Sequence, residues 1–301
     1  MNESLTAAKA DGTYDSIYAN WIGAKRPARS HTRIQTQMKL TRRRRQRLAR
    51  SAGYVVFALV ILAVVAAADW GTLSEAFFRL DVARSMFPEA ITVALRNTVF
   101  YTLMAFAFGL ALGLVLALMR LSSVLPYRWF ATAYIELFRG LPALLVLFMV
   151  GYGVPLAFPD REIPGGVYGS VTLGLGITAA AYMAETIRAG IQAVPKGQLE
   201  AARTLGMSHT RAMISIILPQ AFRIVIPPLT NEIILLTKDT SLVYVLGVTS
   251  TTIELTKFAG DALNTRVNPT PLVVAGLLYL VITLPLGQVV RYLERRAARE
   301  R

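Results

Sequence analysis

Three ionisable residues lie within apolar stretches of the chain: Glu185, Arg223 and Glu232. A charge at the centre of a bilayer costs about 2.5–3.5 kcal/mol on insertion scales, so each needs a partner or a polar cavity. Glu185 precedes Arg188 by one helical turn, which favours an ion pair as the alternative to a path-lining role. Glu232 follows Asn231 and two prolines. An amide and a carboxylate in a broken helix would line a polar path or bond to a neighbouring helix.

The sequence shows no arrangement of residues that would carry out catalysis. It has no GxxxxGK[ST] phosphate loop, no HExxH motif and no GxSxG motif. It has no cysteine, and its two histidines, His31 and His209, are too few for a metal site. We therefore expect no catalytic residue, no metal and no cofactor, and any ATP hydrolysis must occur on another chain.

The most polar segment between two apolar regions is 194–221, VPKGQLEAARTLGMSHTRAMISIILPQA. Pro195 and Gly197 are expected to end the helix that precedes it. Good helix formers occupy 198–205, with Glu200 placed in the first turn, where a carboxylate suits the positive end of the helix dipole. The segment predicts a helix of about two turns held in a loop.

The end of this short helix is also marked in the sequence. Gly206 stands where a helix C-terminal glycine belongs, Ser208 can cap the next helix, and Pro219 is expected to interrupt that helix. An apolar stripe recurs every three residues and must pack against a surface; it consists of Leu199, Ala202 and Leu205.

Composition indicates a membrane protein. Of 301 residues, 54% are hydrophobic and 17% are charged, whereas soluble domains carry about 25% charged residues. Apolar runs predict six membrane-spanning helices, at 52–68, 98–119, 141–158, 167–187, 212–236 and 272–290. A further apolar run, 240–253, is too short to cross and favours a re-entrant or interfacial segment. Within the second span, Gly109 and Gly113 have the GxxxG spacing that permits close helix packing, although glycine is common in membrane helices.

The net charge of +14 is explained by an inside-positive topology. With the N-terminus inside, the basic tail, Arg120, Arg128, Arg139, the 188–211 region and the C-terminal arginines all face the cytoplasm. Nucleic acid binding, which a basic chain also suggests, becomes a minor alternative. We expect residues 1–51 to be a disordered basic tail, 52–70 to be an extra span and 294–301 to be a second basic tail. Ala66 to Ala68 also resemble a signal cleavage site, so the first apolar segment is either retained or removed.

Several stretches resemble one protein family. GQLEAARTLGMSHTRAMISIILPQA resembles the EAA loop of permease subunits of ATP-binding cassette (ABC) importers, on Glu200-Ala201-Ala202, Gly206 and Ile217-Leu218-Pro219. Four other stretches are similar to the polar amino acid branch of these permeases, whose members import His, Glu, Gln, Arg or opines. They are LRNTVFYT, YIELFRGLPALLVLF, AAYMAETIRAGIQAVPKGQ and IPPLTNEIILLTKDTSL. The resemblance covers 91–293.

The resemblance implies an all-α, polytopic type I ABC importer transmembrane domain, with a five-helix core and one extra N-terminal helix. It implies a multi-pass protein of the bacterial inner or plasma membrane with both termini in the cytoplasm. The EAA loop would dock into a cytoplasmic ATPase dimer through Glu200, Ala201, Ala202, Arg203, Leu205 and Gly206. Arg203 and Arg211 would add ionic contacts there, unless they only reflect the inside-positive rule. The other implied partners are an extracytoplasmic amino acid-binding protein, a second permease subunit, identical or related, and a polar amino acid.

Two other classes remain as alternatives. A secondary amino acid transporter would need no ATPase and no docking helix, and a membrane enzyme would need the catalytic residues that the sequence lacks. Glu185, Asn231 and Glu232 are the candidates for the substrate path. The sequence does not identify the amino acid carried.

Overall fold

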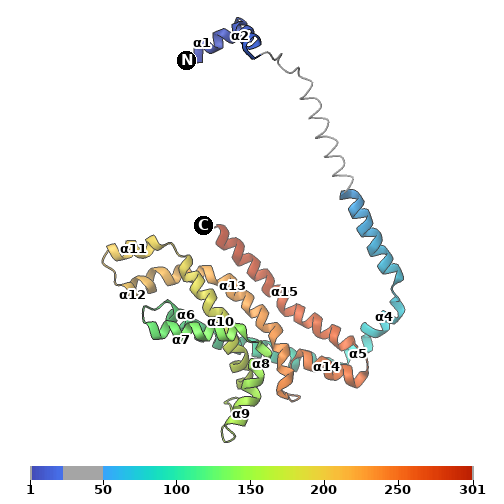
Figure 1. Cartoon of the computed structure of the whole chain (residues 1–301). Coiled ribbons are helices and arrows are strands. Elements are labelled where there is room, and N and C mark those ends of the chain that lie inside the picture. The colour runs from blue at the N-terminus through green and yellow to red at the C-terminus, as the bar shows by residue number, and fades with distance from the viewer. Residues whose placement is uncertain (1, 23–49, 300–301) are drawn as a thin grey trace. The chain divides into compact units, whose positions relative to one another are not determined.

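The computed structural model describes residues 2–22 and 50–299, which are largely α-helical and contain no β-strand. The chain separates into two compact units, Met1–Trp70 and Gly71–Arg301, and each is described by itself (Figure 1). Six membrane-spanning segments are present in the described residues when one bent helix pair is counted as a span. The all-α, polytopic prediction is therefore confirmed.

The first unit contains three described helices: α1 (Asn2–Ala10), α2 (Thr13–Ile22) and the span Arg50–Ala67. The two short helices differ from the disordered tail that we predicted. Ala, Leu and Lys favour helix in α1, and Gly12, with φ of 80°, separates the two helices. Residues 23–49, which carry most of the predicted basic tail, lie outside the described residues.

The second unit is a bundle of long helices joined by short elements. Two α-helices precede the first long one, α4 (Trp70–Phe77) and α5 (Leu80–Arg84). The remaining elements are η1 (Ala90–Leu95), α6 (Arg96–Leu121), α7 (Leu125–Gly140), α8 (Ala143–Phe148), η2 (Met149–Gly153), α9 (Val154–Ala157), α10 (Val167–Ala193), α11 (Lys196–Thr204), α12 (His209–Ala212), η3 (Met213–Ile217), α13 (Leu218–Asp239), η4 (Thr240–Leu246), α14 (Leu255–Arg266) and α15 (Thr270–Arg299).

Helices α6 and α10 pack tightly against each other. A Cβ placed on Gly113 would lie 3.0 Å from the Ala180 carbonyl oxygen, and one on Gly109 would lie 3.1 Å from the Ala179 Cβ. Small residues let helix backbones approach closely, and at these two positions even a methyl group would be tight. The close packing predicted from the GxxxG spacing is therefore confirmed.

The third span is bent, and its first half was missed from sequence. Helix α7 meets α8 at an angle of 106° across Leu141 and Pro142. We predicted a span over 141–158 and assigned no helix to 125–140. Instead α7 forms a full helix because it is amphipathic, with Ala131 and Ile135 fully buried in the core.

The fifth span is longer than predicted, because helix runs from His209 to Leu246. Residues 240–246, which we expected in a separate short segment, extend α13 as the 3₁₀ element η4, and Gly247, with φ of 65°, ends it. The expected break at Pro227 and Pro228 is also absent, since both prolines lie inside α13. Membrane helices tolerate proline where side chains and local adjustments satisfy the freed backbone groups.

Alternating spans place two sets of connections at opposite ends of the second unit. Figure 1 shows α11 and α12 at one end, with α14 and α5 at the other. The α6–α7 corner and the last residues of α10 and α15 belong to the α11 end. The arrangement separates the predicted docking loop from a second polar region around the start of α14.

Candidate functional site

The short helix of the 194–221 segment begins earlier than predicted. Helix α11 starts at Lys196, with Pro195 before it and the Gln198 N–H donating to the Pro195 carbonyl oxygen at 3.0 Å. Gly197 therefore lies inside the helix rather than ending the previous one. Glu200 falls in the second turn, so its predicted place in the first turn is wrong. Proline suits this position because a residue that precedes the helix has no helical partner for the N–H that proline lacks.

The helix ends as predicted at Gly206, which has φ of 83°. The Met207 N–H donates to the Ala202 carbonyl oxygen at 3.1 Å, and the Gly206 N–H donates to the Arg203 carbonyl oxygen at 3.0 Å. This pair of bonds is the Schellman motif, which requires a left-handed residue that glycine adopts without strain. The motif fixes the direction in which the chain leaves α11.

The next helix also starts where the sequence indicated. The Ser208 hydroxyl oxygen accepts a bond from the Arg211 N–H at 3.3 Å and caps α12. Pro219 was expected to interrupt the helix, but the helix continues through the π-helical turn η3, and Pro219 lies in the first turn of α13. A π-helical turn changes the backbone pairing just where proline removes an N–H.

Helix α11 presents a mixed surface. Leu199 packs against the apolar cluster that contains Val194, Ile217 and Ala221, and Ala202 is only 2% exposed. Leu205, the third member of the predicted stripe, is 83% exposed because the backbone has left the helix there. Of the six predicted docking residues, Ala202 thus faces the chain itself. The other five are exposed: Glu200, Ala201, Arg203, Leu205 and Gly206.

Glu185 lies in an ion-pair network rather than on an open surface. Its carboxylate accepts from Arg120 Nη1 of α6 at 2.5 Å and from Arg188 Nε of its own helix at 3.2 Å. Arg188 Nη2 bonds to the second carboxylate oxygen. The pairing with Arg188 that the spacing predicted is present, whereas the partner from α6 was missed because the two residues are far apart in sequence.

Asn231 and Glu232 lie on α13, away from this network. Asn231 is exposed and Glu232 is half-buried. No hydrogen bond or ion pair joins either residue to Glu185 in the part of the chain that the structure describes. The three predicted path residues are therefore not brought together within one chain.

Sequence reasoning also missed a polar cluster at the opposite end. The buried Asn97 donates to the carbonyl oxygens of Thr251 and Ile253 at 2.8 and 2.9 Å and accepts from the Tyr168 hydroxyl at 3.0 Å. The Tyr101 hydroxyl donates to the Thr252 carbonyl oxygen at 2.6 Å. An asparagine inside an apolar helix was the available signal, in the LRNTVFYT stretch.

Glu254 completes this cluster from the other side of the loop. Its carboxylate caps α14 by accepting from the Thr256 and Lys257 N–H groups at 2.6 and 2.7 Å. The Tyr279 hydroxyl of α15 donates to it at 3.2 Å. Burial raises the pKa of Glu254, although these hydrogen bonds act in the opposite direction.

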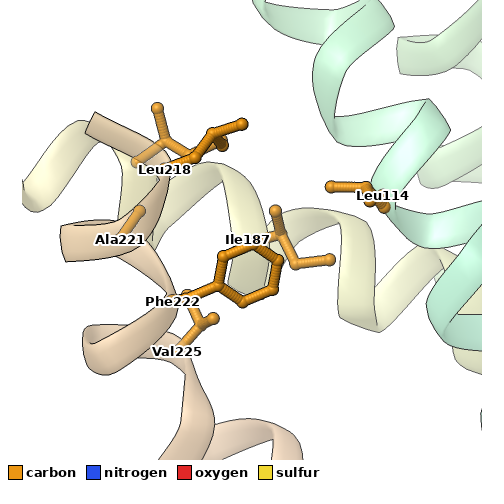
Figure 2. Close-up of a pocket in the computed structure, with 7 residues that line it drawn as sticks. Leu114, Ile187, Leu218, Ala221, Phe222 and Val225 are labelled. Atoms are coloured by element: carbon orange, nitrogen blue, oxygen red, sulfur yellow. The ribbon is translucent and has the colours of Figure 1, made fainter. Parts of the chain in front are cut away.

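A small pocket between α6, α10 and α13 offers no polar contacts. Figure 2 shows Phe222 and Val225 of α13 facing Ile187 of α10. The lining is hydrophobic throughout: Leu114, Ile187, Ile191, Leu218, Ala221, Phe222 and Val225. The pocket does not fit a polar ligand.

The family model described as "Binding-protein-dependent transport system inner membrane component" matches residues 109–299, which include the whole 194–221 segment. The chain belongs to this family. It is a multi-pass membrane protein and the permease subunit of an ABC importer, and the family implies an ATPase and a substrate-binding protein as partners.

Individual relatives agree with the family match. The chain is 40% identical over 200 residues to the probable glutamine ABC transporter permease protein GlnM of Bacillus subtilis, covering 66% of this chain and 89% of that protein. It is 37% identical over 259 residues to the arginine transport system permease protein ArgU of Corynebacterium glutamicum, covering 82% and 80%.

A solved structure shares both the fold and much of the sequence. It is titled "Crystal structure of an amino acid ABC transporter with histidines", and the match has a TM-score of 0.61 and 37% identity. The match covers 69% of this chain and 94% of that one. The type I importer fold with a five-helix core and one extra helix is therefore confirmed. The core spans are α6, the bent α7–α9 segment, α10, α12 to η4, and α15.

Proposed function

We propose that the chain forms the transmembrane path of an ATP-driven importer for polar amino acids. The observation that carries the proposal is the set of relatives whose names specify glutamine, arginine and glutamate/aspartate transport. An extracytoplasmic binding protein delivers the amino acid, and a second permease subunit completes the path. The proposed limits of the importer domain are 91–293.

The docking surface for the ATPase is the exposed side of α11. Glu200 and Arg203 supply opposite charges there, and Leu205 supplies an exposed apolar side chain next to Gly206. Ala202 acts from behind, because its burial holds α11 against the chain's own helices. A short helix that is fixed at both ends transmits a displacement with little loss. In this proposal the surface lies in the cytoplasm together with both termini, and the basic residues at the α11 end support that orientation.

The path candidates on α13 are Asn231 and Glu232. Asn231 is exposed and Glu232 is half-buried. Neither side chain has a hydrogen-bond partner among the described residues of the chain. A polar solute or a second permease subunit supplies such partners. Glu185 is a weaker path candidate, because both of its carboxylate oxygens are already bonded to arginine.

Reconstitution with the candidate ATPase and binding protein tests the function. We expect amino acid uptake into vesicles that requires ATP and falls sharply in Glu200→Lys and Gly206→Asp. The matched control is Glu162→Lys, an exposed glutamate of the loop before α10 that makes the same charge change at the opposite end. Uptake that proceeds without ATP, or that survives both α11 substitutions, contradicts the proposal.

The path is tested separately in the same vesicles. Asn231→Ala and Glu232→Ala are expected to change uptake or amino acid-stimulated ATP hydrolysis, while Asn264→Ala, on the exposed side of α14, is expected to change neither. Wild-type behaviour of both α13 variants at normal expression would assign them a structural role only.

A further inference from the structure

Four charged side chains meet where α6, α7 and α10 approach the α11 end. Arg120 lies between two carboxylates, with Nη1 at 2.5 Å from Glu185 Oε2 and Nη2 at 3.5 Å from Glu136 Oε1. Arg188 holds Glu185 from within α10 and donates to Gln192 Oε1 at 2.6 Å. The network therefore contains one strong bond between helices and several within a helix.

The central three side chains are shielded from water. Their exposed fractions are 20% for Arg120, 26% for Glu185 and 24% for Arg188. Charge-assisted hydrogen bonds in such surroundings are stronger than exposed ion pairs, which contribute little. Each oxygen of Glu185 has an arginine partner, so this carboxylate is not free to bind a solute. Its position indicates a mechanical role.

The network lies near the end of α10 that leads into the docking helix. Helix α10 ends at Ala193, and only two residues, the buried Val194 and the exposed Pro195, connect it to α11. A displacement of α11 therefore pulls on the end of α10. Further along, the contacts of Gly109 and Gly113 fasten α6 to α10. The glycine contacts hold the middle of the pair, and the bond from Arg120 to Glu185 holds the end nearest α11.

We infer that Glu185 is a positioning residue of the energy-coupling step, fastening the ends of α6 and α10 through Arg120 so that α11 moves both helices together. The inference rests on the proposed function, because it needs an ATPase that displaces α11. Without the bond, α10 follows α11 while α6 lags behind. ATP hydrolysis then continues, but less of it produces transport.

Two substitutions with the same chemical change separate this role from a general structural one. Arg120→Gln removes the bond between helices, and Arg188→Gln removes a bond within α10. Each leaves Glu185 with one arginine, so neither strands an uncompensated charge. The experiment measures amino acid transported per ATP hydrolysed in the reconstituted complex with ATPase and binding protein.

We expect the ratio to fall roughly fivefold or more in Arg120→Gln, the lower range of coupling between sites. Glu185→Gln is expected to behave like Arg120→Gln, and Arg188→Gln is expected to stay near wild type. Equal ratios in all variants, or an equal fall in Arg120→Gln and Arg188→Gln, overturn the inference. A wild-type complex without ATP-dependent uptake would instead overturn the proposed function and this inference with it.

A crosslink provides a second test that does not depend on the stability of one variant. The chain has no cysteine, so Arg120→Cys with Glu185→Cys creates a unique pair. A bifunctional maleimide long enough to replace the two side chains should restore the transport ratio that the double variant loses. A crosslinked protein that stays as uncoupled as the unlinked one contradicts the inference.

Discussion

The two polar regions of the second unit are held in different ways. At one end, α11 is positioned by its own backbone: Pro195 opens it, the Schellman bonds at Gly206 close it, and Ser208 starts the next helix. At the other end, the loop before α14 is positioned by side chains from distant helices. Asn97 and Tyr101 of α6 bond to its backbone carbonyl groups.

This difference has consequences for stability and for motion. The bonds of α11 lie within its own short segment, so the helix can be displaced as a unit without breaking them. The bonds of the opposite loop cross between α6, α10, α14 and α15, so that loop cannot move without losing hydrogen bonds between distant elements, of which the bond from Asn97 to Ile253 is buried. We therefore propose that α11 is displaced as a unit during transport and that the α14 end holds its place.

The largest expected effect comes from the end that holds. Asn97→Leu leaves the carbonyl group of Ile253 without its donor in a buried site, and that of Thr251 without its donor at the part-buried edge of the site. We expect a loss of about 2–4 kcal/mol in the free energy of unfolding, because unsatisfied buried groups keep their full desolvation cost. Thermal unfolding in detergent measures this as a lower Tm.

Asn264→Leu is the matched control for Asn97→Leu. Asn264 is an exposed residue of α14, and the same substitution there should change stability by no more than about 0.5 kcal/mol. Similar Tm values for the two variants would show that the Asn97 bonds do not hold the loop.

The same difference explains what the sequence could predict. The spans, the short helix of 194–221, the glycine end at Gly206 and the cap at Ser208 all depend on local signals: apolar run length, proline, glycine and hydroxyl position. These were predicted, although the start of α11 and the place of Glu200 were not. The start of α11 is hard to predict because its N-cap residue, Pro195, makes no side-chain capping bond.

Contacts between distant residues could not be predicted. Nothing near Glu185 in the sequence specifies Arg120, and nothing near Asn97 specifies the carbonyl groups of Thr251 and Ile253. Helix α7 was missed for a related reason. Its apolar face is stabilised by the packing of Ala131 and Ile135 against neighbouring helices, which the local sequence does not reveal. Packing between elements, rather than local propensity, decides these features.

A smaller effect is expected at the end that moves. Gly206→Ala places a Cβ at φ of 83°, where nothing lies within 4 Å, so the cost is backbone strain alone. We expect about 1 kcal/mol of destabilisation at this turn, seen as faster hydrogen exchange of the backbone amides at positions 206 and 207. Gly197 lies inside α11 and also has open space around it, so Gly197→Ala should stabilise the helix by about 0.5–1 kcal/mol. If both substitutions stabilised or both destabilised the protein, the role of the left-handed turn at Gly206 would be contradicted.

The smallest effect concerns pH at the end that holds. Burial raises the pKa of Glu254, so the folded state binds its proton more tightly than the unfolded state does. The stabilisation from that proton is complete below the unfolded pKa and is lost as pH rises through the folded pKa. The Tm of the wild type should therefore fall relative to that of Glu254→Gln as pH rises above about 4.3, the ordinary pKa of a glutamate. The glutamine side chain of that variant does not titrate. A wild-type Tm that stays constant or rises relative to that of Glu254→Gln as pH increases would therefore show that the capping bonds from Thr256 and Lys257 outweigh burial.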